Sequence, residues 1–297
     1  MIIKAGLIGN PLSHSLSPRL FRIFSAQLGE TFSYSLLETR KPDLGRTVER
    51  IKALGWSGFN VTLPLKEAIL PFLDSLSPGA GAIGAVNSVR IKKGRLEGHN
   101  TDAFAVNISL KEAGCLPRGR TCVIWGAGGA ARAAAWVLAG GGAAAVAILS
   151  RSVSQGAGLA RYFTRLFPRV SFTAGPLSGA PRGATVFVNA TPLGMYAPLA
   201  PELRSGGPPG AFYLDFAYNP RPVRTPAPRK RQGPSTGPTP FLADRAGTVI
   251  PGIDLLIYQA LKSAELYCGR RTGAREIVEL KNIIRAGLLR KRYGKNR

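Results

Sequence analysis

The sequence predicts a two-domain α/β fold, and three features of the 297-residue chain predict it. Short apolar, strand-like segments alternate with helical segments along most of the chain, which is typical of sheets covered by helices. A glycine-rich turn joins an apolar strand to an alanine-rich helix near residue 126. Two amphipathic helices close the chain after a segment rich in Pro and Arg.

The first hundred residues are expected to alternate strands and helices. The expected elements are strand Ile2–Ile8, helix Pro18–Leu28, strand Ser33–Leu37, helix Leu44–Leu54, strand Gly58–Leu63, and a hairpin of Val86–Ile91 and Arg95–Gly98. Ser17 and Pro18 suit the N-cap and first-turn positions of the first helix. A further helix is expected to start near Asp102, with Thr101 or Asp102 as its cap.

The glycine-rich turn lies at the centre of the sequence. Strand Thr121–Trp125 runs into Gly126, Ala127, Gly128, Gly129 and Ala130, a helix follows to Ala139, and strand Ala143–Leu149 completes a βαβ unit. Glycines at such a turn let a phosphate approach the backbone and the N-terminal amides of the helix. We therefore predict that residues 126–130 bind a dinucleotide; an ordinary tight strand–helix turn is the alternative.

The residues after the second strand of this unit indicate which dinucleotide is bound. A site selective for NAD usually has an acidic residue there, which holds the ribose hydroxyls. This chain has Ser150, Arg151 and Ser152 instead. A guanidinium grips a 2′-phosphate through paired hydrogen bonds, and the flanking hydroxyls can donate to it. The sequence therefore favours an NADP site here. The alternative interpretation is a solvated arginine at a strand end, with no role in binding.

Further strands and helices are expected in the second half of the chain. They are strands near Val170–Thr173, Ala184–Asn189, Phe212–Phe216 and Thr248–Ile250, and closing helices at Ile253–Tyr267 and Ala274–Leu289. Residues 220–240 contain few apolar side chains, so we expect a mobile loop or insertion there, centred on 221–240.

Composition narrows the class of protein. The formal net charge is +24, but the basic residues are dispersed and no nucleic-acid recognition module accompanies them, so we expect no specific nucleic-acid partner. No uncharged run is suited to a membrane span. The chain enters a strand directly and has three cysteines without metal or redox spacing, so we expect no signal peptide, no metal site and a cytoplasmic location.

Two residues are candidates for proton transfer. Lys66 follows the expected strand Gly58–Leu63 and Pro64, where the chain is expected to enter a helix at the ligand-binding edge of an α/β sheet. A lysine partly withdrawn from water there can act as a general acid or base. Asp102 supplies a carboxylate at a helix start. Taken singly, each has an ordinary structural interpretation, as a surface lysine and as a helix cap.

Several ordered motifs, together with this pair, carry a family resemblance. They are Gly9-Asn-Pro-Leu-Ser-His-Ser-Leu-Ser17-Pro18, Asn60-Val-Thr-Leu-Pro-Leu-Lys66, Gly84-Ala-Val-Asn87, Gly98-His-Asn-Thr-Asp102, Gly126-Ala-Gly-Gly-Ala-Ala-Arg132, Asn189-Ala-Thr-Pro-Leu-Gly194, Asp215-Phe-Ala-Tyr-Asn-Pro220 and Gly252-Ile-Asp-Leu-Leu-Ile-Tyr-Gln259. Over nearly its whole length the chain resembles shikimate dehydrogenases.

The resemblance implies reversible, NADPH-dependent reduction of 3-dehydroshikimate to shikimate in aromatic amino-acid biosynthesis. It implies that Lys66 and Asp102 are the catalytic pair. We assign Lys66 as the main acid/base and Asp102 as its electrostatic and hydrogen-bonding partner; the sequence leaves open which of the two carries the proton. The resemblance assigns Ser15, Ser17, Thr62, Asn87, Tyr218 and Gln259 to the substrate. It also assigns Ala190, Thr191 and Gly252 to cofactor binding, in addition to residues 126–130 and 150–152.

The same resemblance implies a domain organisation. Residues 1–101, completed by 252–297, are expected to form the α/β substrate domain, and residues 102–251 the Rossmann-like NADP domain. The family includes monomers and homodimers, so the oligomeric state stays open. Gln155 stands where a second arginine often follows in the family, which weakens the expected preference for NADP.

Two alternatives remain at this point. One is a quinate or quinate/shikimate dehydrogenase that uses NAD or both cofactors. The other is a non-catalytic paralogue that binds a ligand or nucleic acid.

Overall fold

The computed structural model describes residues 2–195, 197–204, 207–218, 241 and 247–290. The chain divides into two compact units, residues 1–108 with 256–297, and residues 109–255. The expected α/β class with a Rossmann-like part is confirmed. The assignment of substrate binding to 1–101 with 252–297, and of cofactor binding to 102–251, stays a prediction.

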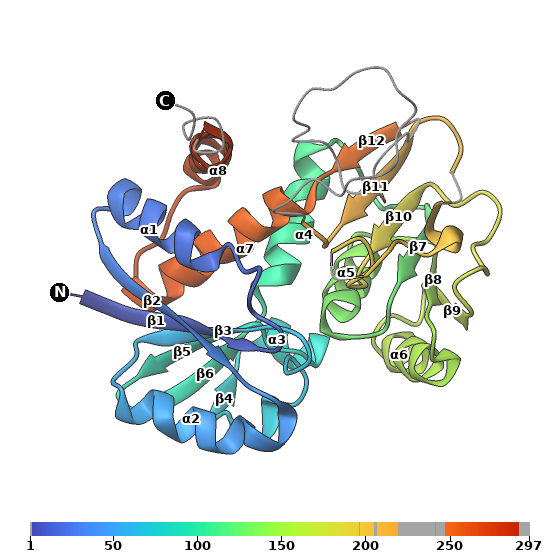
Figure 1. The fold of residues 1–297 in the computed structure, drawn as a ribbon. Helices are drawn as coiled ribbons and strands as arrows, with labels where there is room; N and C mark the ends of the chain where they lie inside the picture. Colours follow the sequence, from blue (N-terminus) through green and yellow to red (C-terminus); the bar gives the residue numbers. More distant parts are fainter. Residues whose placement is uncertain (1, 196, 205–206, 219–240, 242–246, 291–297) are drawn as a thin grey trace. The chain divides into compact units, whose positions relative to one another are not determined.

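The first unit contains a six-stranded mixed sheet (Figure 1). Its order is β2 (Thr31–Glu38), β1 (Ile2–Gly9), β3 (Gly58–Val61), β5 (Ser88–Lys92), β6 (Arg95–His99) and β4 (Ser75–Leu76). β1 pairs in parallel with β2 and β3, whereas β5 and β6 form an antiparallel hairpin beside β3. The three predicted strands and the hairpin are confirmed; the two-residue strand β4 was not expected.

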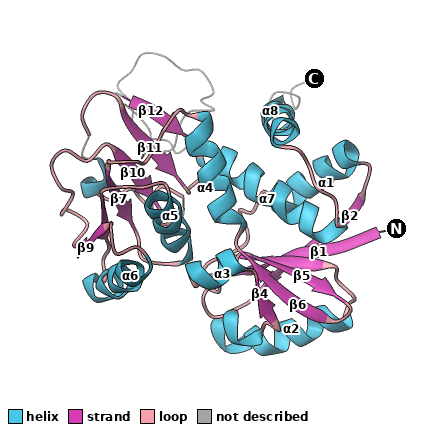
Figure 2. Cartoon of the chain, turned by 180° about the vertical axis from the view of Figure 1, so that it is seen from behind, coloured by secondary structure: helices cyan, strands magenta, loops and turns pink. Residues whose placement is uncertain are grey.

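Helices cover both faces of this sheet (Figures 1 and 2). The helical segments are α1 (Ser17–Leu28), η1 (Lys41–Asp43), α2 (Leu44–Ala53), η2 (Leu70–Phe72), α3 (Pro78–Ile83), the start of α4 (Thr101–Glu112), most of α7 (Gly252–Cys268), and α8 (Ala274–Arg290). Helix α2 buries Leu44, Val48 and Ile51 in the core cluster on one face. On the other, the Tyr267 ring of α7 lies against β3, where Gly58 leaves room for it: a Cβ at Gly58 would lie 2.3 Å from the ring.

Three local predictions in this unit are wrong. Helix α1 begins at Ser17 itself, with Leu16 at the N-cap position, rather than after a Ser17 cap. The cap of α4 is Asn100, whose Oδ1 accepts a hydrogen bond from the Ala103 amide at 3.0 Å; neither Thr101 nor Asp102 caps it. Lys66 lies in a series of turns before η2 rather than in a helix. Freed from capping, the Asp102 carboxylate is available to a partner.

The second unit contains a six-stranded parallel sheet (Figure 1). Its order is β12 (Gly247–Ile250), β11 (Ala211–Asp215), β10 (Val186–Asn189), β7 (Thr121–Trp125), β8 (Ala145–Leu149) and β9 (Ser171–Gly175). The first strand, β7, lies between the fourth and the second, which is the doubly wound order of dinucleotide-binding domains. The predicted strands of this unit are confirmed.

Helices α5 (Gly129–Gly140) and α6 (Val153–Leu166) and the short η3 (Pro201–Arg204) accompany this sheet. Helix α5 was predicted, but α6 was not. The core of the unit gathers the aromatic rings of Trp125, Phe187, Tyr213 and Phe241. The predicted insertion at 220–240 lies outside the described residues. Among the helices that are described, none is long and apolar enough to cross a membrane.

Candidate active site

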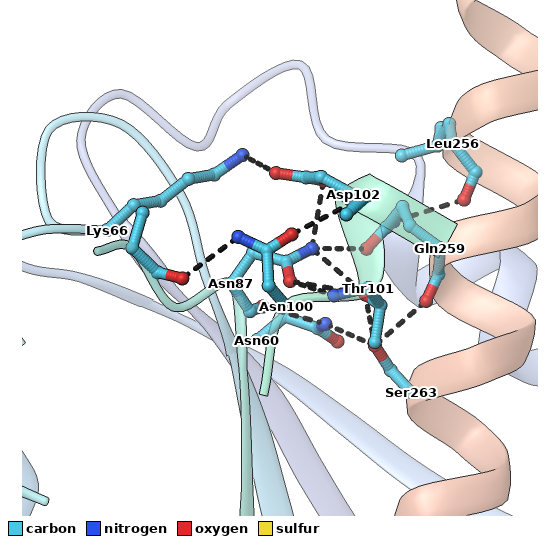
Figure 3. A network of polar contacts seen from close by, with 11 residues as sticks. Asn60, Lys66, Asn87, Asn100, Thr101, Asp102, Leu256, Gln259 and Ser263 are labelled. Atoms are coloured by element: carbon cyan, nitrogen blue, oxygen red, sulfur yellow. Dashed lines mark hydrogen bonds and ion pairs between the residues drawn. The ribbon is translucent and has the colours of Figure 1, made fainter. Parts of the chain in front are cut away.

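Lys66 and Asp102 form a close ion pair in the first unit (Figure 3). Lys66 Nζ lies 2.5 Å from Asp102 Oδ2, and the two side chains are 16% and 7% exposed. The partial exposure of Lys66 leaves its ammonium accessible to a ligand. The structure therefore brings together the two groups that the sequence selected for proton transfer.

Asn87 fixes the other side of this carboxylate. Its Nδ2 donates to Asp102 Oδ1 at 2.9 Å and to Thr101 Oγ1 at 2.9 Å, and lies 3.4 Å from Gln259 Oε1. Its Oδ1 accepts the Thr101 amide hydrogen at 2.6 Å. Both oxygens of Asp102 thus accept hydrogen bonds from side chains held in place by neighbouring elements.

Backbone contacts explain how residues far apart in sequence converge here. The Val86 amide donates to the Lys66 carbonyl at 2.8 Å, which ties the turn after β3 to the segment that precedes β5. Asn100 Nδ2 donates to the Ala85 carbonyl at 2.9 Å and anchors the start of α4 to the same segment. Lys66 and Asn87 therefore project from two loops, and Asp102 from the start of α4, at one edge of the sheet.

Ser15, Ser17 and Thr62 lie on the loops after β1 and β3. The Thr62 amide donates to the Ile8 carbonyl, so the two loops start side by side. Ser15 Oγ accepts the Ser17 amide hydrogen at 3.2 Å, and Ser17 is 5% exposed at the first position of α1. The predicted contact of these three hydroxyls with a substrate stays a prediction.

His99, three residues before Asp102 in the sequence, is a half-buried titratable residue. Burial lowers its pKa below the ordinary 6.5; Glu97 opposes that shift, and the charges of Arg90 and Lys262 add to it. Its Nε2 has no hydrogen-bond partner among the described residues. The imidazole is therefore neutral around pH 7.

Three buried polar residues of this cluster were not predicted as site residues: Asn60, Thr101 and Ser263. Asn60 Nδ2 donates to Ser263 Oγ at 2.8 Å, and Thr101 Oγ1 lies 3.2 Å from the same oxygen. Thr101 could have been found as the neighbour of Asp102. Ser263 could have been found because it follows Gln259 by four residues, which places both on one face of α7.

The glycine-rich turn of the second unit has the geometry that a phosphate site requires. Gly126 has φ = +113°, and a Cβ there would lie 2.8 Å from the Ala190 carbonyl oxygen. At Gly128, by contrast, an added Cβ meets nothing within 4 Å. Helix α5 starts at Gly129, so the first amides of the helix have no intrahelical partners. Open space beside free amides fits a bound pyrophosphate.

Asn189 organises the loop beside that turn. Its Nδ2 donates to Asp215 Oδ1 at 2.8 Å, and its Oδ1 accepts from Thr191 Oγ1 at 2.6 Å and from the Thr191 amide. Asn189 and Asp215 are fully buried. Ala190 and Thr191, both predicted to contact the cofactor, therefore lie on a loop with a fixed shape.

The residues after β8 divide into two groups. Ser150 Oγ donates to the Ser152 carbonyl at 2.8 Å, and Ser152 Oγ accepts the Gln155 amide hydrogen at the start of α6. Arg151 is exposed. Ser150 is thus bonded to the neighbouring backbone, and the contact of Arg151 with a 2′-phosphate stays a prediction.

Tyr218 and Gly252 complete the predicted set. Tyr218 is half-buried at the end of a described segment. Gly252 opens α7 in close contact with backbone: a Cβ there would lie 2.2 Å from the Ala217 carbonyl oxygen. Any side chain at position 252 would therefore displace the chain after β11. The roles of both residues in ligand binding stay predictions.

Comparisons with known proteins place these features in a family. The shikimate dehydrogenase substrate-binding domain matches residues 7–89. A shikimate dehydrogenase (NADP(+)) of Moorella thermoacetica is 35% identical over 89% of this chain and 87% of its own length. The chain belongs to the shikimate dehydrogenase family.

Solved structures agree with this membership. A shikimate 5-dehydrogenase of Thermus thermophilus in complex with NADP(H) and shikimate has a TM-score of 0.73 at 30% identity, covering 95% of this chain and 99% of that one. A 5-ketofructose reductase of a Gluconobacter strain has a TM-score of 0.75 at 29% identity, covering 96% and 99%. The same fold is therefore found in proteins named for two different substrates, the alcohol shikimate and the ketone 5-ketofructose.

Proposed function

We propose that the chain catalyses the reversible, NADP-dependent interconversion of shikimate and 3-dehydroshikimate. The observation that carries the proposal is the Lys66–Asp102 ion pair, held by Asn87 beside Gln259 in the first unit. Family membership supports the reaction, and the glycine turn at Gly126 supports the cofactor. The bound nicotinamide would supply or accept the hydride.

Lys66 is the acid/base in this proposal. Asp102 already accepts hydrogen bonds at both oxygens, from Lys66 and Asn87, so it serves as the acceptor that orients the ammonium. The Lys66 ammonium has further N–H groups beyond the one that faces Asp102. In the reducing direction it donates a proton to the carbonyl oxygen as the carbon receives hydride, and in the oxidising direction the neutral amine accepts the hydroxyl proton.

The remaining residues bind and orient the substrate. Ser15 and Ser17 would hold its carboxylate near the N-terminus of α1, where helix amides favour anions. Thr62, Asn87, Tyr218 and Gln259 would contact the ring hydroxyls. Gln259 Nε2 donates to the Leu256 carbonyl at 3.0 Å, and this hydrogen bond fixes the orientation of the amide.

The cofactor is assigned to the second unit. Residues 126–130 would hold the pyrophosphate, Ala190, Thr191 and Gly252 the nicotinamide side, and Arg151 the 2′-phosphate. Ser150 and Ser152 would shape the loop that carries Arg151. Because Gln155 adds no second charge, the preference for NADP over NAD rests on one guanidinium.

Initial rates with pairs of substrates and cofactors test the proposal. Purified protein is assayed with shikimate and quinate against NADP⁺ and NAD⁺, and with 5-ketofructose against NADPH. We expect the highest kcat/KM for shikimate with NADP⁺. A higher value with quinate or 5-ketofructose would assign a different substrate. No turnover with any pair, together with salt-sensitive DNA binding, would favour a non-catalytic protein.

A further inference from the structure

Helix α7 turns three polar side chains toward the sheet at four-residue spacing. Gln259 lies 3.4 Å from Asn87 Nδ2, Ser263 Oγ accepts from Asn60 Nδ2 at 2.8 Å, and Tyr267 Oη lies 3.0 Å from Ser88 Oγ. Tyr267 is buried, and burial raises the pKa of its phenol. Figure 3 shows Gln259 and Ser263 on this helix, facing Asn60, Asn87 and Thr101, the last at the start of α4.

Ser263 lies at the centre of this row and joins three elements. Its hydroxyl is within hydrogen-bonding distance of Asn60 on β3, of Thr101 at the start of α4, and of the Gln259 carbonyl on its own helix at 2.9 Å. Ser263 is fully buried, and Asn60 and Thr101 are 4% and 2% exposed. At such burial, water does not readily replace a missing partner, so each of these hydrogen bonds constrains its neighbours.

Counting donors and acceptors assigns a direction to the network. Asn60 Nδ2 can only donate and the Gln259 carbonyl can only accept. Ser263 Oγ donates to the Gln259 carbonyl at 2.9 Å, so its hydrogen is used neither for Thr101 Oγ1, 3.2 Å away, nor for the Tyr267 phenol, which also hydrogen-bonds with Ser263. The Thr101 hydroxyl is then the donor toward Ser263, and its lone pair faces Asn87 Nδ2.

This direction determines how Asn87 uses its two amide hydrogens. One points to Thr101 Oγ1 and the other to Asp102 Oδ1, both at 2.9 Å. If the Thr101 hydroxyl turned instead to Asn87 Oδ1, 3.3 Å away, its lone pair would no longer face Nδ2. An acceptor at position 263 keeps the Thr101 hydroxyl turned away from Asn87 Oδ1, which then stays bonded to the Thr101 amide at 2.6 Å while Nδ2 donates to Thr101 Oγ1.

We propose that Ser263 is a positioning residue for the Lys66–Asp102 pair: its hydroxyl orients Thr101, and Thr101 orients the Asn87 amide that holds Asp102. The inference rests on the proposed function for its kinetic consequences. The proposed orientation of Thr101, Asn87 and Asp102 does not depend on which substrate the protein uses.

Substitution of Ser263 by Ala tests this role in the full-length protein. Loss of one buried hydrogen-bond partner typically costs a free energy that corresponds to about a tenfold change in an equilibrium constant. We therefore expect kcat/KM for shikimate to fall about tenfold. The pH dependence of kcat/KM should shift, because the carboxylate beside Lys66 is less well held. KM for NADP⁺ should be unchanged. Thr101→Val, which removes the other hydroxyl but keeps the shape, should have the same effect, whereas Thr101→Ser should not.

Ser25→Ala is the matched control. Like Ser263, Ser25 donates to the carbonyl four residues earlier on its own helix, that of Phe21. It also accepts a hydrogen bond from a neighbouring strand, from the Phe32 amide at 2.9 Å. It should lose comparable thermal stability while it keeps the wild-type kcat/KM and pH profile. Equal kinetic losses in Ser25→Ala and Ser263→Ala would overturn the proposal, as would wild-type kinetics in Ser263→Ala.

Double-mutant analysis and crystal structures complete the test. Ser263→Ala and Thr101→Val should be non-additive, since both remove the same link; additive losses would contradict it. Crystal structures of the unliganded wild type and Ser263→Ala test positioning even if shikimate is not the substrate. We expect the Asn87 and Asp102 side chains to shift by about 0.5 Å or more, the scale that matters for a catalytic site. Superimposable side chains would refute the inference, whereas an inactive wild type would refute only the proposed function.

Discussion

Side chains orient the ion pair at Lys66, whereas backbone geometry shapes the turn at Gly126 itself. In the first unit, Asn60, Asn87, Thr101 and Ser263 bond one another and Asp102 through side-chain atoms. In the second unit, the turn depends on a positive φ and on the approach of the Ala190 carbonyl. Proton transfer requires a group at a defined point, whereas phosphate binding requires open space and amides.

This difference predicts different responses to substitution. A changed side chain near Lys66 should reduce turnover and leave the fold and the cofactor affinity intact. A changed residue near Gly126 should alter backbone geometry and cofactor affinity together.

Lys66→Ala should have the largest effect on turnover. Loss of a positioned acid/base typically lowers kcat by about 10²–10⁴-fold. The Kd for NADP⁺, measured by fluorescence titration, should change less than about twofold, because the residues assigned to the cofactor are untouched. Near-wild-type turnover would remove Lys66 from the mechanism.

Substitutions at Gly126 and Gly128 should separate two requirements of the turn: its backbone conformation and the open space for the cofactor. Gly126→Ala combines a φ of +113° with a 2.8 Å approach to the Ala190 oxygen, so both the thermal midpoint and NADP⁺ affinity should fall, the affinity by about tenfold or more. Gly128→Ala meets no protein atom within 4 Å, so only cofactor affinity should fall. Equal loss of thermal stability in both would contradict this account of the turn.

Arg151→Ala should reduce cofactor discrimination. Loss of a charge-assisted hydrogen bond to a phosphate corresponds to about 1.5–3 kcal/mol, so KM for NADP⁺ should rise by at least about tenfold while KM for NAD⁺ changes little. The ratio of the two KM values from initial rates is the measurement. A parallel rise in both would show that Arg151 does not read the 2′-phosphate.

His99→Gln should have the smallest effect, on the pH dependence of stability. The unfolded chain binds a proton at His99 more readily than the native protein, because burial lowers the native pKa. The wild type should therefore lose stability as pH falls through about 6.5, until the native imidazole is itself protonated. Urea unfolding between pH 5 and 8 should show a shallower decline for the variant. An unchanged pH dependence would contradict a half-buried imidazole that is neutral in the native protein.

Local chemistry was sufficient to predict much of this molecule. Strand β7, the glycine turn and helix α5 follow from an apolar run, three glycines and an alanine-rich segment that are contiguous in sequence. The hairpin β5–β6 follows from its Lys93-Gly94 turn, where both residues have positive φ. Lys66 and Asp102 were selected as a pair by family motifs, and the structure brings them into contact.

Features that depend on distant contacts could not be predicted in the same way. Helix α6 contains Gly156 and Gly158, which weaken its helical pattern, and packing of Leu159 and Phe163 outweighs that weakness. Helix α3 is short and glycine-rich, and its Ser77 cap is a small local signal. Asn60 and Ser263 meet across 203 residues of sequence, so only the fold reveals that hydrogen bond.

The turnover of Lys66→Arg at saturating shikimate and NADP⁺ tests the central claim most directly, because arginine keeps the positive charge beside Asp102 but does not release a proton. If Lys66 acts by moving a proton, kcat should fall by about 10²-fold or more while both ligands still bind. A Lys66→Arg variant that retains more than about half of the wild-type kcat would contradict the claim and leave Lys66 with a purely electrostatic role.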